Sequence, residues 1–157
     1  LSDLLVELEA TSGRDLSSWV STWLQTSGVN TLRPVIESDG QSYKSLAIKQ
    51  EAPKIPAGST ELRPHRAAVG LYDLKDGQLL RRKSVELDIS GDLTQVKELS
   101  GEKLADLLLI NDHDLTYAKI RFDNKSITTL KDHLGKLDDG LSRALCWSAA
   151  GDMFRDA

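Results

Sequence analysis

The feature that most constrains the fold of this chain is a strict alternation of apolar and polar residues in its central part. Residues 84–89 read Ser-Val-Glu-Leu-Asp-Ile, residues 67–72 alternate in the same way, and Leu46 and Ile48 give a shorter example. Side chains of a strand point alternately to its two faces, so this period of two predicts half-buried strands. The continuous apolar segment 107–110 predicts a strand that is buried on both sides.

Turn signals separate these strand segments. Asp39-Gly40 and Asp76-Gly77 each lie between two of them, and this dipeptide tolerates the positive φ angles of tight hairpins. Residues 51–64 hold three of the four prolines and predict a long surface connection between two sheets. About six strands with hairpin turns and no intervening helices predict a mainly β fold, an antiparallel β-sandwich.

Helical patterns occupy the N-terminal end of the chain. Leu1, Leu4, Leu5 and Leu8 share one face, and Gly13 is placed for a left-handed C-terminal cap. A second helix is predicted from Asp15 as N-cap to Gly28, with Leu16, Trp19, Val20, Trp23 and Leu24 on one stripe. Trp19 and Trp23 could form an aromatic platform for a ligand, but we interpret them as buried anchors.

Helical patterns return after residue 122. Asp123 precedes Ile127, Leu130 and Leu134, with Gly135 as the expected stop. Asp138 or Asp139 then opens a longer helix whose predicted apolar stripe is Leu141, Ala144, Leu145 and Ser148. The chain begins at Leu1 without a methionine, and the last helix reaches the C-terminus still apolar, so we interpret the chain as excised from a longer protein. The expected division is therefore 1–28 helical, 29–122 β-sandwich and 123–157 helical.

Composition excludes several classes of function. With 24 acidic and 20 basic side chains, the net charge is −4, which disfavours a nucleic-acid binder. The basic run Arg81-Arg82-Lys83 is soon followed by Glu86 and Asp88, and we interpret it as the solvated side of a strand. No apolar stretch approaches the roughly 20 residues of a membrane span, so no membrane partner is expected. A single cysteine excludes an intrachain disulfide and suits a reducing, cytoplasmic compartment.

Motifs for catalysis and metal binding are absent from the sequence. No two histidines are four residues apart, as a zinc protease helix requires, and Cys146 between Leu145 and Trp147 suggests a small buried residue. Asn111, Asp112, His113 and Asp114 could hold a divalent cation, but they lack the order of a calcium loop. We interpret this cluster as turn chemistry. We therefore expect no catalytic residue and no metal ligand in this chain.

Three stretches together resemble the zinc aminopeptidase N family. They are Asp15 to Gly28 with its Trp19 and Trp23, then Arg63-Pro64-His65-Arg66 running into Val69 to Asp73, and finally Asn111 to Asp123. The last stretch continues in Leu141 to Trp147 and Asp152 to Ala157. The resemblance covers nearly the whole chain in the family's order, and it is closest to the bacterial cytosolic branch.

The resemblance implies a position downstream of the catalytic motifs. The family's His-Glu-x-x-His helix and its Gly-x-Met-Glu-Asn segment do not occur here, so zinc is expected in the parent's catalytic domain. It implies that 1–28 are the last helices of that catalytic domain and that 123–157 begin a C-terminal helical domain. Both domains would be partners of this chain, and peptide substrate would be reached only through the parent. The residues expected at the two domain junctions are Trp19, Trp23, Asn111, Tyr117, Lys119, Asp123 and Trp147.

The sequence therefore leaves two hypotheses about function. The first is a non-catalytic linker and β-sandwich region of a zinc metallo-aminopeptidase, an enzyme that removes N-terminal amino acids from peptides. The alternative is a free-standing β-sandwich module that binds a protein or a carbohydrate. Only 5% of the residues are aromatic, and the three tryptophans fall in predicted helices, which disfavours the alternative.

Overall fold

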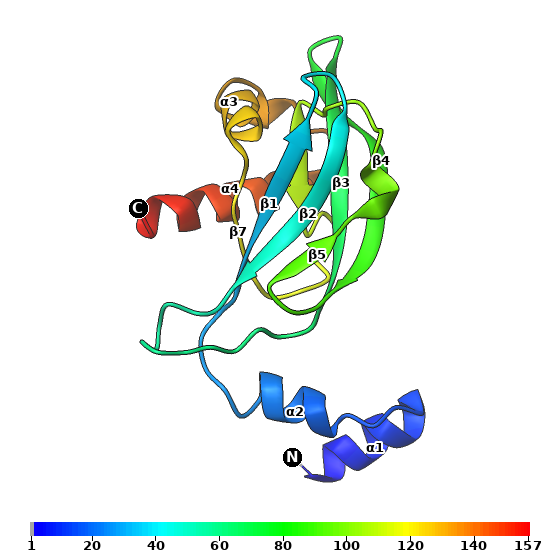
Figure 1. Ribbon diagram of the computed structural model, residues 1–157, viewed down its shortest axis with the longest axis vertical. Helices are drawn as coiled ribbons and strands as arrows, with labels where there is room; N and C mark the ends of the chain where they lie inside the picture. The colour runs from blue at the N-terminus through cyan, green and yellow to red at the C-terminus, as the bar shows by residue number, and fades with distance from the viewer. Residues whose placement is uncertain (1) are drawn as a thin grey trace.

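The computed structural model describes residues 2–157 and contains seven strands between two pairs of helices (Figure 1). The helices are α1 (Ser2–Ser12), α2 (Ser17–Trp23), α3 (Asn124–His133) and α4 (Gly140–Arg155). The strands are β1 (Thr31–Ser38), β2 (Tyr43–Glu51), β3 (His65–Lys75), β4 (Gln78–Ile89), β5 (Leu93–Gln95), β6 (Leu107–Ile110) and β7 (Lys119–Ile120). Short 3₁₀ turns lie at η1 (Lys97–Leu99) and η2 (Leu134–Lys136). The predicted mainly β sandwich with helices at both ends is confirmed.

The strands form two sheets with the orders β5-β2-β1-β7 and β4-β3-β6. All pairs are antiparallel except β1 and β7, which run parallel and place Leu32 opposite Ile120. The sequence prediction had no parallel pair, because a strand of two residues carries no readable alternation. The predicted hairpin at Asp76-Gly77 is confirmed, and both residues have positive φ angles, 51° and 77°. The predicted long connection is also confirmed, since it carries the chain from β2 of one sheet to β3 of the other.

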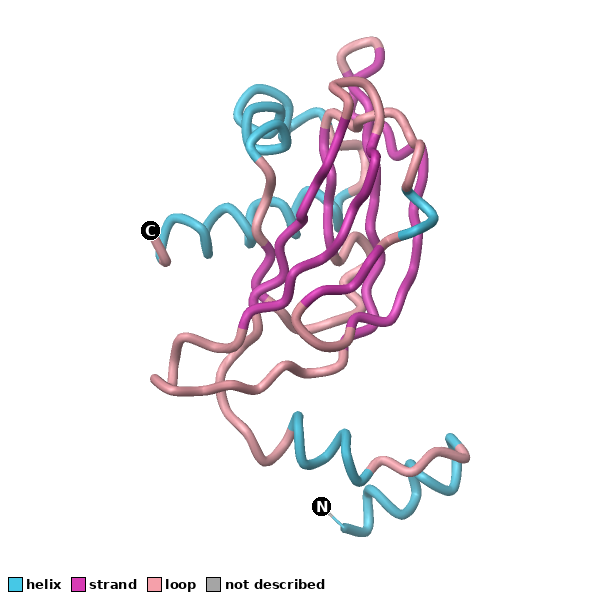
Figure 2. The backbone as a smooth tube through the Cα atoms, in the orientation of Figure 1, coloured by secondary structure: helices cyan, strands magenta, loops and turns pink. Residues whose placement is uncertain are grey.

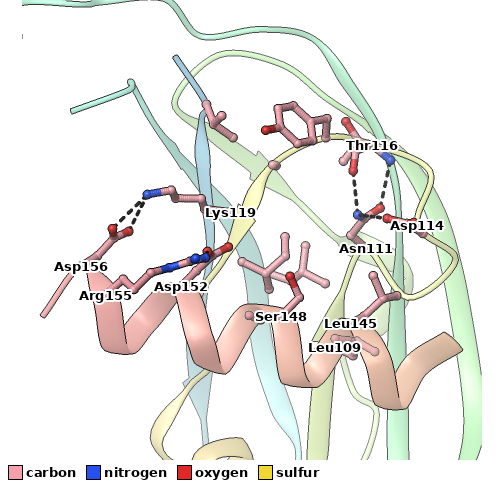
Figure 3. A pocket seen from close by; sticks show the side chains of 16 residues that line it. Leu109, Asn111, Asp114, Thr116, Lys119, Leu145, Ser148, Asp152, Arg155 and Asp156 are labelled. Carbon is pink, nitrogen blue, oxygen red and sulfur yellow. Dashed lines mark hydrogen bonds and ion pairs between the residues drawn. The ribbon is translucent and has the colours of Figure 1, made fainter. Parts of the chain in front are cut away.

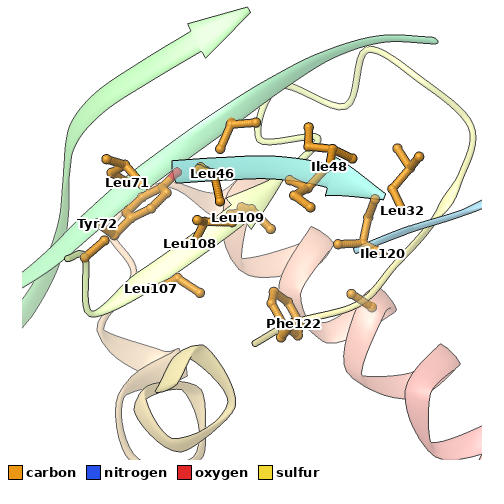
Figure 4. Close-up of a cluster of buried hydrophobic side chains, with 14 of the residues drawn as sticks. Leu32, Leu46, Ile48, Leu71, Tyr72, Leu107, Leu108, Leu109, Ile120 and Phe122 are labelled. Atoms are coloured by element: carbon orange, nitrogen blue, oxygen red, sulfur yellow. The ribbon is translucent and has the colours of Figure 1, made fainter. Parts of the chain in front are cut away.

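The strands β3 and β6 are buried on both faces because the molecule has a third layer. Paired residues of antiparallel strands point to the same side, so Val69 and Ile110 share one face while Tyr72 and Leu107 share the other. The first pair belongs to the buried core cluster, and Figure 4 shows other members of that cluster, among them Leu71 of β3 and Leu46 of the opposite sheet. On the second face, the Tyr72 hydroxyl lies 2.7 Å from Ser142 Oγ of α4. The C-terminal helices therefore cover the outer face of the second sheet.

The C-terminal helices begin where the sequence predicts. The Asp123 carboxylate accepts backbone N–H bonds at the start of α3, and Asp139 does the same for Ser142 at the start of α4. Gly135 is not the stop of α3, because the helix ends at His133 and Gly135 lies inside η2.

The apolar stripe predicted for α4 is not the side that faces the sheet. Leu141, Ala144 and Ser148 are exposed, and Leu145 is half-buried. The side that faces the sheet carries Ser142, Cys146 and Ala149 instead. Hydrogen bonds of Ser142 with Tyr72 and Asp112 turn this polar residue inward, and an apolar periodicity could not indicate that.

The N-terminal helices lie beyond one end of the sandwich (Figures 1 and 2). Gly13 ends α1 with a φ of 66°, as predicted. Asp15 accepts a hydrogen bond from the Ser17 N–H, but it is not the N-cap residue of α2, which is Leu16, one position later. The structure describes no buried residue in α1 and only Val20 in α2. Trp19 is 40% exposed in this chain, and its role as an anchor on the catalytic domain stays a prediction.

The predicted limits at residues 28 and 122 fall close to the changes of secondary structure, but the division into domains stays a prediction. No helix in the described part of the chain is long and apolar enough to cross a bilayer.

Candidate functional site

A buried arginine joins the N-terminal helices to the sandwich. Arg63, which precedes β3, is 2% exposed, and its guanidinium group donates hydrogen bonds to four acceptors. Nε reaches Thr22 O at 3.0 Å and Nη1 reaches Asn30 Oδ1 at 3.0 Å. Nη2 reaches Thr26 Oγ1 at 2.6 Å and Ser27 O at 3.1 Å. One side chain thus holds the end of α2 and the chain that follows it.

The charge of Arg63 is stabilised without a carboxylate. Among residues 2–157, none of its four acceptors is a carboxylate. Two of its acceptors are backbone carbonyl groups at and just beyond the C-terminal end of α2, where the helix dipole is negative. Its guanidinium carbon also lies 5.6 Å from the centre of the Trp23 ring, within the range of a cation–π contact. These contacts explain how a charged side chain can be buried at this junction.

His65 extends the junction into the sandwich. Its ring meets the Trp23 ring edge-to-face at 5.2 Å, Nδ1 lies 2.7 Å from Thr116 Oγ1, and Nε2 lies 3.0 Å from Gln50 Oε1. Burial, aided by the nearby charge of Arg63, lowers the pKa of His65 to about 4. His65 is therefore a neutral structural group at pH 7, with one ring nitrogen donating and the other accepting.

A second buried network joins the sandwich to α4. Asp112 is fully buried, and its Oδ2 accepts a hydrogen bond from Arg81 Nη1 at 2.8 Å. Its Oδ1 accepts bonds from the Tyr72 hydroxyl and, at 3.2 Å, from Ser142 Oγ. Burial and the contact with Asp112 raise the pKa of Tyr72, which stays a neutral donor. This carboxylate therefore ties together β3, β4 and α4.

The close approach of Asp112 depends on a glycine in β3. A Cβ atom at Gly70 would lie 2.5 Å from Asp112 Oδ2 and 2.9 Å from Tyr72 Cε2. No side chain fits there without displacement of the carboxylate. Gly70 therefore makes the space for the Asp112 network.

The cluster at 111–114 forms a turn and takes part in structural bonds. Asn111 and Asp114 both have positive φ angles, 64° and 55°, and the Asn111 side chain bonds to the backbone of Thr116. His113 lies 3.6 Å from Glu86 and 3.8 Å from Asp112, whose Oδ2 is already bonded to Arg81. Within residues 2–157, no three or more His, Cys, Asp or Glu side chains are placed to hold a metal ion. That the chain lacks catalytic and metal sites stays a prediction.

The C-terminal end of α4 is held by a separate ion cluster. Asp156 accepts bonds from Lys119 at 2.8 Å and from Arg121, and the contact with Lys119 lowers the pKa of this aspartate. Between α4 and the segment 109–120 lies a cavity of about 520 Å³ (Figure 3). Its walls include Asn111, Tyr117 and Lys119, three of the residues predicted at a domain junction.

The remaining predicted junction residues are dispersed. Tyr117 is 73% exposed and Trp147, on the outer side of α4, is 67% exposed. Asp123 caps α3, and Trp19 lies on α2. Trp23 and Asn111 were predicted at different junctions, but the structure connects them through His65 and Thr116. Whether these residues form domain junctions stays a prediction.

Sequence reasoning missed the residues that do most of the joining. Arg63 and His65 were noted only as part of a resembling motif, and Tyr72, Asp112 and Ser142 were not singled out as partners. Their contacts span between 15 and 70 positions in the sequence, so no local pattern could indicate them. The one sequence signal that could have pointed to Arg63 is its place at the end of the proline-rich connection, directly before Pro64.

Comparison with known proteins identifies a clear relative. The chain is 52% identical over 162 aligned residues to aminopeptidase N from Streptomyces lividans. The alignment covers the whole of this chain but only 19% of that protein, so the chain spans about a fifth of its relative. No family model matches the chain.

Proposed function

Because this chain belongs to the aminopeptidase N family, we propose that it is the non-catalytic linker and β-sandwich region of a zinc metallo-aminopeptidase. Such an enzyme removes N-terminal amino acids from peptides. The observation that carries the proposal is the identity over the whole chain combined with the small share of the relative that it spans. The chain supplies a scaffold, and the chemistry belongs to other parts of the longer protein.

The two buried networks support a scaffolding role. Arg63 ties the sandwich to the helices before it, and Asp112 ties it to the helices after it. Interdigitated sheets resist deformation, so groups attached to both ends keep a defined spacing. A sandwich of this kind can set the distance between a catalytic part and a C-terminal part.

The residues present do not fit a zinc site. His65 bonds to Gln50 and Thr116, His113 lies beside Glu86 and Asp112, and His133 ends α3, so the three imidazoles serve separate elements. Catalytic zinc is therefore assigned to the part of the longer protein outside this chain. A cytoplasmic location agrees with the single buried cysteine.

The partners of this region are the catalytic part and the C-terminal helical part of the longer protein. An isolated helix as short as α1 is marginal in water, and Leu4, Val6 and Leu8 on it are exposed. A covering surface from the catalytic part would stabilise it. On the other side, an apolar groove between α3 and α4, with Trp147 and Phe154 at its rim, fits the next helices of the C-terminal part. Peptide substrates would be bound by these partners and not by this region itself.

The proposal is tested in the longer protein that carries this region. Substitution Asp112→Asn weakens the link between sandwich and α4, so aminopeptidase turnover should fall while zinc content by mass spectrometry is unchanged. The control is Lys97→Ala on the solvent-facing turn η1, which should leave both quantities unchanged. Loss of zinc in proportion to activity in the Asp112 variant would place metal binding in this region and contradict the proposal.

The alternative, a free-standing binding module, has less support. The most exposed aromatic side chains are Tyr117, Trp147 and Phe154, and they lie on a loop and on α4 rather than together on a sheet face. Ligand platforms of binding modules need neighbouring rings on one surface.

A further inference from the structure

The two ends of the sandwich are attached to their helices in different ways. The helix α4 is held at its beginning by Ser142, which bonds to Asp112 and Tyr72. It is held along its middle by the buried Cys146 and Ala149, and at its end by Asp156 with Lys119 and Arg121. A helix fixed at three places along its length cannot turn without breaking all three contacts.

The N-terminal helices have no comparable attachment. Among the described residues, the helix α1 has no buried side chain, and the Leu16 N–H at the cap of α2 donates a hydrogen bond to Glu9 Oε1 of α1 at 2.8 Å. The helix α2 meets the rest of the molecule at its last turn, through Arg63 and through the edge contact of Trp23 with His65. Before Thr22, only Val20 is buried among the described residues, so this part of the chain has little packing besides that at the last turn of α2.

The pivot for a movement is also defined. Gly28 has a φ of 91°, and a Cβ there would lie 2.4 Å from Pro53 Cβ, so this residue is fitted closely to the proline-rich connection. Asn30 is buried, and its side chain donates to Glu61 O at 2.6 Å. The chain is thus fixed from Gly28 onward, while residues 24–27 between this point and α2 are held chiefly by Arg63.

We propose that α1 and α2 move as one unit about residues 24–27, that Arg63 is the latch of this hinge, and that α3 and α4 stay rigidly attached to the sandwich. Opening breaks the bonds of Arg63 to Thr22, Thr26 and Ser27, and the guanidinium group then gains water in exchange. The consequence of this hinge for the longer protein rests on the proposed function. In the longer protein, the sandwich and C-terminal helices would travel together, and spacing would change on the catalytic side.

The test uses pairs of spin labels in the intact chain. One pair joins Ala10→Cys on α1 to Ser84→Cys on β4, and the other joins Ser84→Cys to Ser148→Cys on α4; all three sites are exposed. Burial raises the pKa of the native Cys146 thiol to about 12, so this cysteine stays unlabelled. Pulsed electron–electron double resonance then gives one distance distribution for each pair of labels.

In the unsubstituted background, we expect the 10–84 distribution to be clearly broader than the 84–148 distribution. Arg63→Met should broaden the first further and leave the second unchanged. The matched control is Arg121→Met, which removes one contact of Asp156 but leaves Ser142 bonded to Asp112, so it should change neither distribution. Amide exchange in α2 should rise by about tenfold or more in the Arg63 variant alone.

Equal widths for the two pairs in the unsubstituted background would overturn the proposal, and this comparison needs no substitution at Arg63. Equal broadening of both pairs by Arg63→Met would also overturn it, because Arg63 would then support the whole fold rather than one joint. Either result leaves the scaffolding role intact. Conversely, aminopeptidase turnover by this chain would contradict the proposed function without altering the distances.

Discussion

Arg63 and Asp112 are both buried charges, and the chain neutralises them in different ways. Asp112 has a full ion pair with Arg81 in addition to two hydroxyl donors, whereas Arg63 relies on carbonyl and side-chain oxygens near the end of α2. A buried charge that loses its partners is costly, so each group fixes the element that supplies those partners. Neither role was readable from the sequence, because the partners are brought together only by the packing of distant elements.

The buried state of His65 predicts a pH dependence of stability. Its pKa is lowered from 6.5 to about 4 in the folded chain, so between these values the unfolded chain binds a proton that the folded chain does not. The free energy of unfolding should therefore decrease as the pH falls through this window, with a slope from this group of at most about 1.4 kcal/mol per pH unit. Above pH 6.5 the contribution is constant.

Urea unfolding at pH values between 4 and 7 measures this dependence. His65→Gln should flatten the curve relative to the parent chain. Identical slopes for the parent chain and the His65 variant would show that this histidine does not titrate differently on folding.

Gly70 predicts a steric effect at a single position. Gly70→Ala would push a methyl group into Asp112 and Tyr72, so we expect a loss of about 1–3 kcal/mol in the free energy of unfolding, the usual cost of overpacking. Gly151→Ala is the matched control, since nothing lies within 4 Å of its added carbon and it sits inside α4. That change should stabilise the chain by about 0.5–1 kcal/mol. Thermal unfolding of the two variants should therefore show a lower melting temperature for Gly70→Ala and a higher one for Gly151→Ala.

At the scale of elements, local sequence patterns predicted most of the strands, turns and helix starts. Period-two alternation located β3 and β4, the Asp-Gly pairs located hairpin turns, and Asp123 and Asp139 marked helix starts. The errors arose where tertiary contacts decide: the inward face of α4 is set by Ser142, and the short β7 is stabilised by its parallel partner. The exposure of Trp19 reflects a helix whose apolar side has no cover among the described residues.

The N-cap of α3 gives a prediction at this scale. Asp123 accepts the N–H groups of Lys125 at 2.9 Å and Ser126 at 3.0 Å. The Ser126 hydroxyl also donates to Asp123 Oδ2 at 2.5 Å and accepts the Leu108 N–H of β6 at 2.9 Å. Asp123→Ala should therefore lower stability by about 1 kcal/mol and raise amide exchange at Leu108 as well as in α3. Asp132→Ala, an exposed change in the same helix, should do neither. Unchanged exchange at Leu108 would show that the cap does not support the sheet edge.

At the scale of the whole molecule, the chain is a sandwich with a loosely attached pair of helices at one end and a firmly attached pair at the other. This asymmetry, together with membership of the aminopeptidase N family, is the basis for a scaffold that lies between functional parts. The family resemblance was visible in the sequence, but the way each joint is built was not. Domain limits, partners and the site of zinc binding are features of the longer protein and follow from the proposal rather than from this chain alone.

We propose that this chain is a scaffold without catalytic activity, and an activity assay tests this most directly. The purified 157-residue chain is incubated with zinc and a panel of aminoacyl arylamides, beside the longer aminopeptidase N from Streptomyces lividans as the positive control. We predict no release of arylamine above the buffer rate from the chain, and clear turnover from the longer enzyme. Turnover that copurifies with the chain, is lost on chelation and returns with zinc would contradict the account.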